Sequence, residues 1–137
     1  EALMHGELTA DAAAAFARER LDQSPMIYST ADPEMVQAAQ QRFGRDAIAH
    51  AVEAFFGNVA TQLVDAGVRR IVVGGGETSG AVVTALGVES LRIGPEIDPG
   101  VPALVAEGKR PVHLALKSGN FGATDFYAKA LRVMEGA

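Results

Sequence analysis

A buried strand that runs directly into three glycines and then into a helix constrains this fold more than any other feature. Residues 70–73, Arg-Ile-Val-Val, show no alternation of apolar and polar side chains. That pattern is typical of strands whose two faces are both covered by helices. Glycines occupy positions 74–76, and the next residues open a helix that we expect to extend to Leu86. A strand, a tight turn and a helix in this order indicate an α/β sheet.

Hydrophobic spacing and capping residues predict the other elements. We expect Phe16 and Leu21 on the buried side of the first helix, a turn-rich loop over 94–102, and Thr124 as the cap of the last helix. The sequence thus predicts an α/β fold, a single domain over residues 1–137 whose mainly parallel sheet is covered by helices on both faces. The expected helices are 12–22, 33–42, 46–66, 77–86 and 124–135, and the expected strands are 26–29, 70–73, 90–93, 103–106 and 112–117.

Composition excludes several classes of protein. The 137 residues are 48% hydrophobic and 21% charged, which indicates one globular domain. The absence of cysteine excludes a disulfide scaffold, a thiolate nucleophile and a cysteine-ligated zinc site. A net charge of -5 argues against bulk binding to nucleic acid or to an anionic membrane. No apolar run approaches the roughly 20 residues that a membrane span requires.

The first candidate site is the glycine turn itself. Glycines allow the backbone to turn tightly, and the following helix start offers free N–H groups that favour phosphate. The motif is not a Walker A loop, because no Gly-Lys-Ser/Thr follows at the required spacing. A tight turn that binds no ligand is equally compatible with this spacing. The candidate residues are Gly75, Gly76, Glu77, Thr78 and Ser79.

A second glycine loop, residues 118–122, follows the apolar strand 112–117 in the same way. Ligands bind at the carboxyl ends of strands in open α/β sheets, so parallel neighbouring strands would place both loops at one edge. Lys117 has the charge to meet a phosphate, although a lysine at a strand end often only reaches solvent. The candidate residues are Lys117, Ser118, Gly119 and Asn120, of which Asn120 also suits a plain turn.

The loop expected over residues 94–102 contains two acids between prolines and glycines. Glu96 and Asp98 have the chemistry to orient a metal ion or ribose hydroxyl groups. They are also compatible with solvated carboxylates on a rigid surface loop.

Three stretches resemble the C-terminal nucleotide-binding domain of the four-carbon acid sugar kinase family, which includes 3-oxo-tetronate, threonate and erythronate kinases. They are Val-Val-Gly-Gly-Gly-Glu-Thr-Ser-Gly-Ala-Val at 72–82, Ile-Gly-Pro-Glu-Ile-Asp-Pro-Gly-Val-Pro at 93–102, and Leu-Ala-Leu-Lys-Ser-Gly-Asn-Phe-Gly-Ala at 114–123. The stretches follow one order over nearly the whole chain, which makes the resemblance far more specific than a single glycine run. One departure is Ala103, where family members often carry tryptophan.

The resemblance implies ATP-dependent phosphorylation of a hydroxyl group on a four-carbon sugar acid, with Mg²⁺ accompanying the nucleotide. It implies that the candidate residues of the two glycine loops line the ATP site. The acceptor site and the catalytic residues are implied to lie in an N-terminal domain that this sequence lacks. We therefore expect a C-terminal part of a longer two-domain kinase that is inactive alone, with a cytoplasmic location and a homodimeric assembly.

Two other classes of function remain open at this point. The same loops would suit a non-catalytic regulatory module that binds a nucleotide or another anion. A protein-interaction module is the third class, which the lack of an exposed amphipathic or low-complexity segment disfavours.

Overall fold

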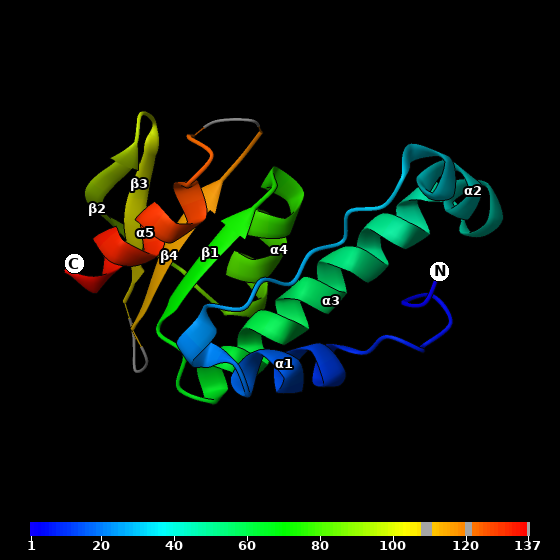
Figure 1. Ribbon diagram of the computed structural model, residues 1–137, viewed down its shortest axis with the longest axis horizontal. Helices are drawn as coiled ribbons and strands as arrows, with labels where there is room; N and C mark the ends of the chain where they lie inside the picture. The colour runs from blue at the N-terminus through cyan, green and yellow to red at the C-terminus, as the bar shows by residue number, and fades with distance from the viewer. Residues whose placement is uncertain (108–110, 120–121, 137) are drawn as a thin grey trace.

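The computed structural model describes residues 1–107, 111–119 and 122–136 (Figure 1). The chain forms an α/β fold, as predicted, with helices packed on a mixed sheet. The sequence also predicts a turn at residues 107–109, after the expected strand 103–106, and this turn lies largely outside the described residues. The helices are α1 (Ala10–Arg18), η1 (Leu21–Gln23), α2 (Pro33–Phe43), α3 (Arg45–Asp65), α4 (Gly76–Ala85) and α5 (Phe126–Glu135), and the strands are β1 (Arg70–Gly74), β2 (Leu91–Asp98), β3 (Val101–Ala106) and β4 (Val112–Lys117).

The described strands form one sheet in the order β1-β4-β3-β2. β1 and β4 are parallel, whereas β4 with β3 and β3 with β2 are antiparallel. The prediction of a mainly parallel sheet was therefore wrong. Pro99 and Gly100 connect β2 to β3 directly, and a connection this short permits only antiparallel pairing.

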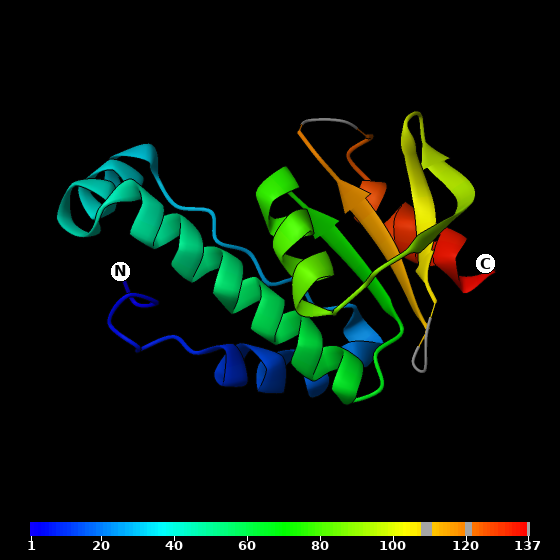
Figure 2. The same cartoon turned by 180° about the vertical axis from the view of Figure 1, so that it is seen from behind.

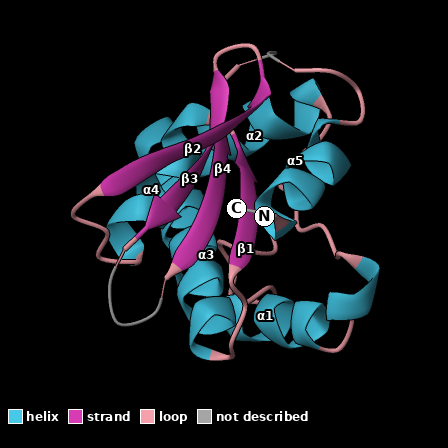
Figure 3. Ribbon diagram, turned by 90° about the vertical axis from the view of Figure 1, so that its left-hand side faces the viewer, coloured by secondary structure: helices cyan, strands magenta, loops and turns pink. Residues whose placement is uncertain are grey.

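Helices cover both faces of the sheet, as predicted (Figure 3). On one face, α5 packs on Ala103 and Ala115 through Phe126, Ala130 and Met134. On the other face, α3 and α4 pack on alternate residues of the same strands, including Leu104, Leu114 and Leu116 (Figure 2). Side chains that alternate along a strand point to opposite faces, so β4 turns Leu114 and Leu116 towards α3 and α4 and Ala115 towards α5.

The first helix buries a different stripe from the one expected. Thr9 caps α1, because its side chain accepts a hydrogen bond from Ala12 N–H. Ala13, Ala14 and Ala17 are the buried residues of α1, whereas Phe16 is 48% exposed and Leu21 is 47% exposed. The predicted buried positions of these two large side chains were therefore wrong, because small alanines allow α1 to lie close to α3.

Residues 26–29, predicted to form a strand, pair with no strand of the described sheet. They form part of an extended segment that runs alongside α3 towards α2 (Figures 1 and 2). Only Ile27 packs against the α1–α3 core, and Tyr28 is 72% exposed. A short apolar run does not form a strand where no neighbouring strand offers hydrogen bonds.

The predicted helices 33–42 and 46–66 agree closely with α2 and α3. α2 begins at Pro33 and is capped at its C-terminal end by Gly44. Gly57, within α3, lies so close to α4 that a Cβ atom there would be 2.9 Å from Ala85 Cβ. The glycine is therefore a point of close packing between α3 and α4.

The segment 94–102 is a β-hairpin and not the predicted loop. Gly94 lies within β2, where a Cβ atom would be 3.1 Å from Ala103 O, so the glycine permits close approach to β3. β2 lies at the edge of the sheet, and its register with β3 shifts on both sides of Glu96. Edge strands and such irregularities are the places in a sheet that tolerate proline.

The last helix begins two residues after Thr124, with Asp125 at its N-cap. Thr124 was therefore wrongly predicted as the cap. Among the described residues, no helix has the length and the hydrophobicity that crossing a membrane requires.

Candidate functional site

The two glycine loops lie next to each other at one edge of the sheet. β1 and β4 are parallel neighbours, with Gly74 opposite Lys117 at their carboxyl ends. Gly75 N–H donates to Lys117 O at 2.8 Å, and a Cβ atom on Gly76 would be 3.9 Å from Ser118 Cβ. The arrangement expected of parallel neighbours is thus the one observed.

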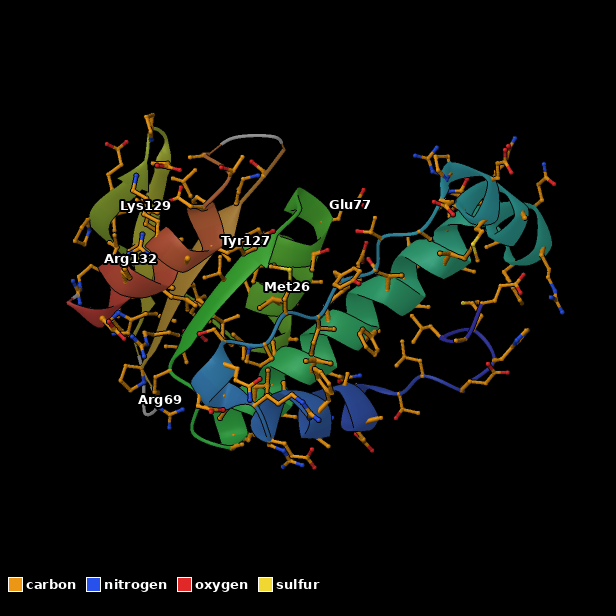
Figure 4. The ribbon with its side chains drawn as sticks, viewed as in Figure 1. Met26, Arg69, Glu77, Tyr127, Lys129 and Arg132 are labelled. Atoms are coloured by element: carbon orange, nitrogen blue, oxygen red, sulfur yellow. The ribbon has the colours of Figure 1, made fainter. Side chains whose placement is uncertain are left out.

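The first loop, residues 74–79, turns the chain from β1 into α4. Gly75 has φ 105° and ψ 132°, a conformation that glycine adopts far more readily than any other residue. Ser79 N–H donates to Gly75 O at 2.9 Å, so the first N–H groups of α4 have no partner within the helix. Figure 4 shows Glu77 at this end of α4, with its side chain directed outward. The loop therefore presents backbone donors and the positive end of a helix dipole.

Ser79 differs from its neighbours in the first loop because it is buried, with 8% of its surface exposed. Its hydroxyl group has no hydrogen-bond partner among the described residues. A buried hydroxyl group that stays unpaired costs about 1–3 kcal/mol of folding free energy.

The second loop is described at 118, 119 and 122, and Asn120 lies outside the described residues. Lys117 Nζ donates to Gly119 O at 2.8 Å, so the lysine braces the loop that follows it. Gly119 has φ 62°, in the left-handed region that favours glycine. Ser118 is exposed beside the first loop. The described candidates of the second loop thus come together, with Lys117 half-buried and tied to the backbone.

Tyr127 is a neighbour of the site that the sequence did not reveal. Its side chain extends from α5 towards β1 and places the hydroxyl group against Gly74 (Figure 4). A Cβ atom at Gly74 would overlap that hydroxyl group, so the first of the three glycines serves this contact. No local pattern connects the two residues, because they come from elements that are far apart in the chain.

Asp98 is neither a solvated carboxylate nor a free ligand. Only 7% of its side chain is exposed. Asp98 Oδ2 accepts a hydrogen bond from Ala123 N–H at 3.0 Å, and Oδ1 pairs with Lys129 Nζ of α5. Glu96 Oε1 instead accepts from Gly100 N–H at 3.0 Å and supports the hairpin turn. Both acids therefore have structural partners.

We predict that Asp98 makes the stability of the domain sensitive to acid. The hydrogen bond from Lys129 and then that from Ala123 N–H lower the pKa of Asp98 below its ordinary value of 3.8, and burial opposes them. A lowered pKa in the folded state stabilises the protein above the unfolded pKa, and this stabilisation is lost as the pH falls through the folded value. Urea unfolding between about pH 6 and pH 3 measures it.

The expected result is that Asp98→Asn unfolds at lower urea concentration than wild type near pH 6, with the difference shrinking at acid pH. Glu89→Gln, which alters an exposed acid, is the control and should follow wild type at each pH. A difference between Asp98→Asn and wild type that stays constant down to about pH 3 would contradict the coupling.

Metal ligands do not gather anywhere in the part of the chain that the structure describes. No group of three or more His, Asp or Glu side chains lies in an arrangement that would hold a metal ion. Glu77 is the carboxylate at the first loop, and Asp98 is engaged by Ala123 and Lys129.

A groove of about 730 Å³ lies away from the glycine loops, between α1, α2 and α3. Its lining is mostly apolar and includes exposed side chains such as Phe16, Met26, Tyr28 and Met35. The sequence did not predict this surface, because Phe16 was expected on the buried side of a helix and residues 26–29 were expected to form a strand. An exposed apolar face is therefore present, although no exposed amphipathic segment was recognised in the sequence.

Residues 1–127 match the family described as the nucleotide-binding C-terminal domain. The 3-oxo-tetronate kinase of Pseudomonas savastanoi pv. phaseolicola is 53% identical over 135 residues, which are 98% of this chain and 31% of that protein. The 3-oxo-tetronate kinase of Burkholderia multivorans is 54% identical over 136 residues, 99% of this chain and 32% of that protein. The chain thus spans about a third of the length of these relatives.

The fold is also similar to a solved structure. The crystal structure of a protein from Haemophilus influenzae superposes with a TM-score of 0.82 at 40% sequence identity. The match covers 90% of this chain and 30% of that chain.

Proposed function

Because the chain belongs to the nucleotide-binding C-terminal domain family, we propose that it is the ATP-binding part of a kinase that phosphorylates a four-carbon sugar acid. The observation that carries the proposal is the meeting of two glycine loops at the carboxyl ends of β1 and β4. Relatives more than 50% identical over nearly the whole chain are named 3-oxo-tetronate kinase, which supports the substrate class.

The residues of the first loop suit the phosphates of ATP. The N–H groups of Gly76, Glu77 and Thr78 have no partner within α4. Together with the dipole of α4, they favour negative charge at that point. Gly75 keeps the backbone in a turn that lets a ligand approach closely. The Ser79 hydroxyl group is buried, and we include Ser79 in the proposed site on the strength of the sequence. These groups position phosphates without moving, which is the main requirement of phosphoryl transfer.

The second loop supplies the opposite wall. Ser118 presents its backbone beside Gly76, and the Lys117 ammonium group adds a positive charge at Gly119 O within the second loop. Backbone amides and one lysine are sufficient to hold a polyanion locally, although the chain carries a net charge of -5. We include Asn120 in the proposed site on the strength of the sequence.

Mg²⁺ fits this donor set as a companion of the nucleotide. Mg²⁺ is commonly held by one or two carboxylates together with phosphate oxygens and water. Glu77, exposed at the start of α4, is the carboxylate placed to contribute, and the ion would neutralise phosphate charge there.

We propose that the acceptor site and the catalytic base lie in the part of the relatives that this chain does not span. No role in proton transfer is assigned to a residue of this chain. The proposal includes a cytoplasmic location, because the kinase uses ATP from that compartment, and a homodimeric assembly.

Calorimetric titration of the chain with ADP, Mg·ATP and inorganic phosphate tests the proposal. We expect both nucleotides to bind at least about ten times more tightly than phosphate, since adenosine adds contacts that phosphate lacks. Lys117→Ala should weaken ADP binding about tenfold, because it removes a charge and the bond to Gly119 O. Equally weak binding of all three ligands would instead favour a generic anion-binding module.

A further inference from the structure

We propose that Asp98 is a positioning residue for the nucleotide: from the end of β2 it holds the descending arm of the second glycine loop, residues 122 and 123, in the shape that binds. This inference rests on the proposed nucleotide-binding function and assigns a role to a residue outside both loops. Asp98 is the last residue of β2, at the turn of the β2–β3 hairpin. Its carboxylate is therefore placed by the pairing of Asp98 with Val101 of β3.

The contacts of Asp98 join the β2–β3 hairpin to two segments much further along the chain. Ala123 N–H, 25 positions further along, donates to Oδ2 at 3.0 Å. Lys129 Nζ, 31 positions further along, pairs with Oδ1. The hairpin, the end of the glycine loop and the first turns of α5 are thereby held in one arrangement. Hydrogen bonds to a charged group are stronger than neutral ones, so this is a firm connection.

The descending arm has little freedom to take another path. Gly122 has φ 92°, and a Cβ atom there would lie 2.9 Å from Phe126 Cδ2, 3.2 Å from Asp98 Oδ2 and 3.3 Å from Lys117 Cε. The chain therefore passes between these three side chains, and only glycine fits. Asp98 therefore contacts the descending arm at a confined point of its path.

Both arms of the second loop are thus held by charged side chains. Lys117 Nζ holds the ascending arm, residues 118 and 119, by donating to Gly119 O at 2.8 Å. Asp98 holds the descending arm by accepting from Ala123 N–H. Lys117 O also accepts from Gly75 N–H of the first loop at 2.8 Å. A displacement of the descending arm would therefore shift the backbone beside Gly75, where the phosphates are proposed to bind.

Asp98 acts through the backbone and not on the ligand. Its carboxylate is buried and both of its oxygen atoms have protein partners. Ligand affinity depends on how far the binding backbone is already arranged before the ligand arrives, because ordering a loop costs free energy. Loss of the Asp98 contacts should consequently lower affinity beyond any effect on global stability.

The test measures ADP affinity and thermal stability in the same set of variants. Asp98→Asn keeps one acceptor but places an amide against the Lys129 ammonium group. Lys129→Gln keeps the bond from Ala123 N–H to Asp98. In the variant that carries both substitutions, the introduced asparagine amide can donate to the carbonyl oxygen of the introduced glutamine and still accept from Ala123 N–H. Val64→Ala, in the core on the opposite face of the sheet, is the control for lost stability.

We expect Asp98→Asn to raise the ADP dissociation constant about tenfold and Lys129→Gln to raise it about threefold, at a temperature where every variant is folded. The double variant should recover most of the affinity lost in Asp98→Asn. Val64→Ala should lower the melting temperature without changing the dissociation constant.

Wild-type affinity for ADP in Asp98→Asn, together with a lowered melting temperature, would overturn the positioning role and leave the proposed function intact. Failure of the double variant to recover affinity would also contradict it. Failure of the wild-type chain to bind ADP would refute the proposed function, and the positioning role with it.

Discussion

Gly76→Val is expected to lower the affinity for ADP about a hundredfold while the free energy of unfolding stays within about 1 kcal/mol of wild type. Gly76 is the first residue of α4, and the nearest atom to its Cβ position is Ser118 Cβ at 3.9 Å, an ordinary contact distance. Valine therefore fits the folded chain. Its methyl groups would occupy the space between the two loops and keep phosphate away from the N–H groups of α4.

Gly80→Val is the matched control for this variant. It makes the same substitution in the same helix, at a position where a Cβ atom meets nothing within 4 Å. Calorimetry with ADP should give the wild-type dissociation constant, and urea unfolding should show a similar stability for the two variants. A Gly76→Val protein that binds ADP as tightly as Gly80→Val would show that nucleotide does not enter between the loops.

Phe126→Ala is expected to reduce the free energy of unfolding by about 3–5 kcal/mol. Phe126 is 1% exposed and packs in the core between α5 and the sheet. Its ring also contacts the Gly122 position and forms an edge-to-face pair with Tyr127, with 5.9 Å between ring centroids. Truncation leaves a cavity at the base of the second loop, and urea unfolding measures the loss.

Phe16→Ala provides the comparison, since it removes the same side chain from a site that is 48% exposed. Its expected cost is below about 1 kcal/mol, because most of the contacts of a core residue are missing there. Similar losses of stability in the two variants would mean that Phe16 is covered in solution and that the α1 surface differs from the one described.

Local signals predicted the elements that carry the site. The buried run before Gly74, the glycines after it and the polar start of α4 form one continuous motif, so short-range physics is sufficient to recognise it. The same holds for α3, which has a long apolar face and ends before Gly67 with φ 103°. Strong periodicity and glycine positions are encoded within a few residues.

Two errors arose where the structure of a segment depends on whether another strand lies beside it. Gly94 was interpreted as a turn residue, although it lies inside β2 beneath the backbone of Ala103. The segment 26–29 has the composition of a strand, but no strand lies beside it to complete the hydrogen bonds. Composition reports what a segment favours by itself, and pairing depends on what lies next to it.

By itself, the sequence determined that the chain forms an α/β domain with two glycine loops, each at the end of an apolar strand, because those patterns are local. Only the tertiary structure decided that β4 lies parallel to β1, so that Gly75 and Lys117 share a hydrogen bond. It also decided that Asp98 is buried against Ala123 and Lys129. Such contacts join residues 25 or more positions apart, and their partners are chosen by the packing of whole elements.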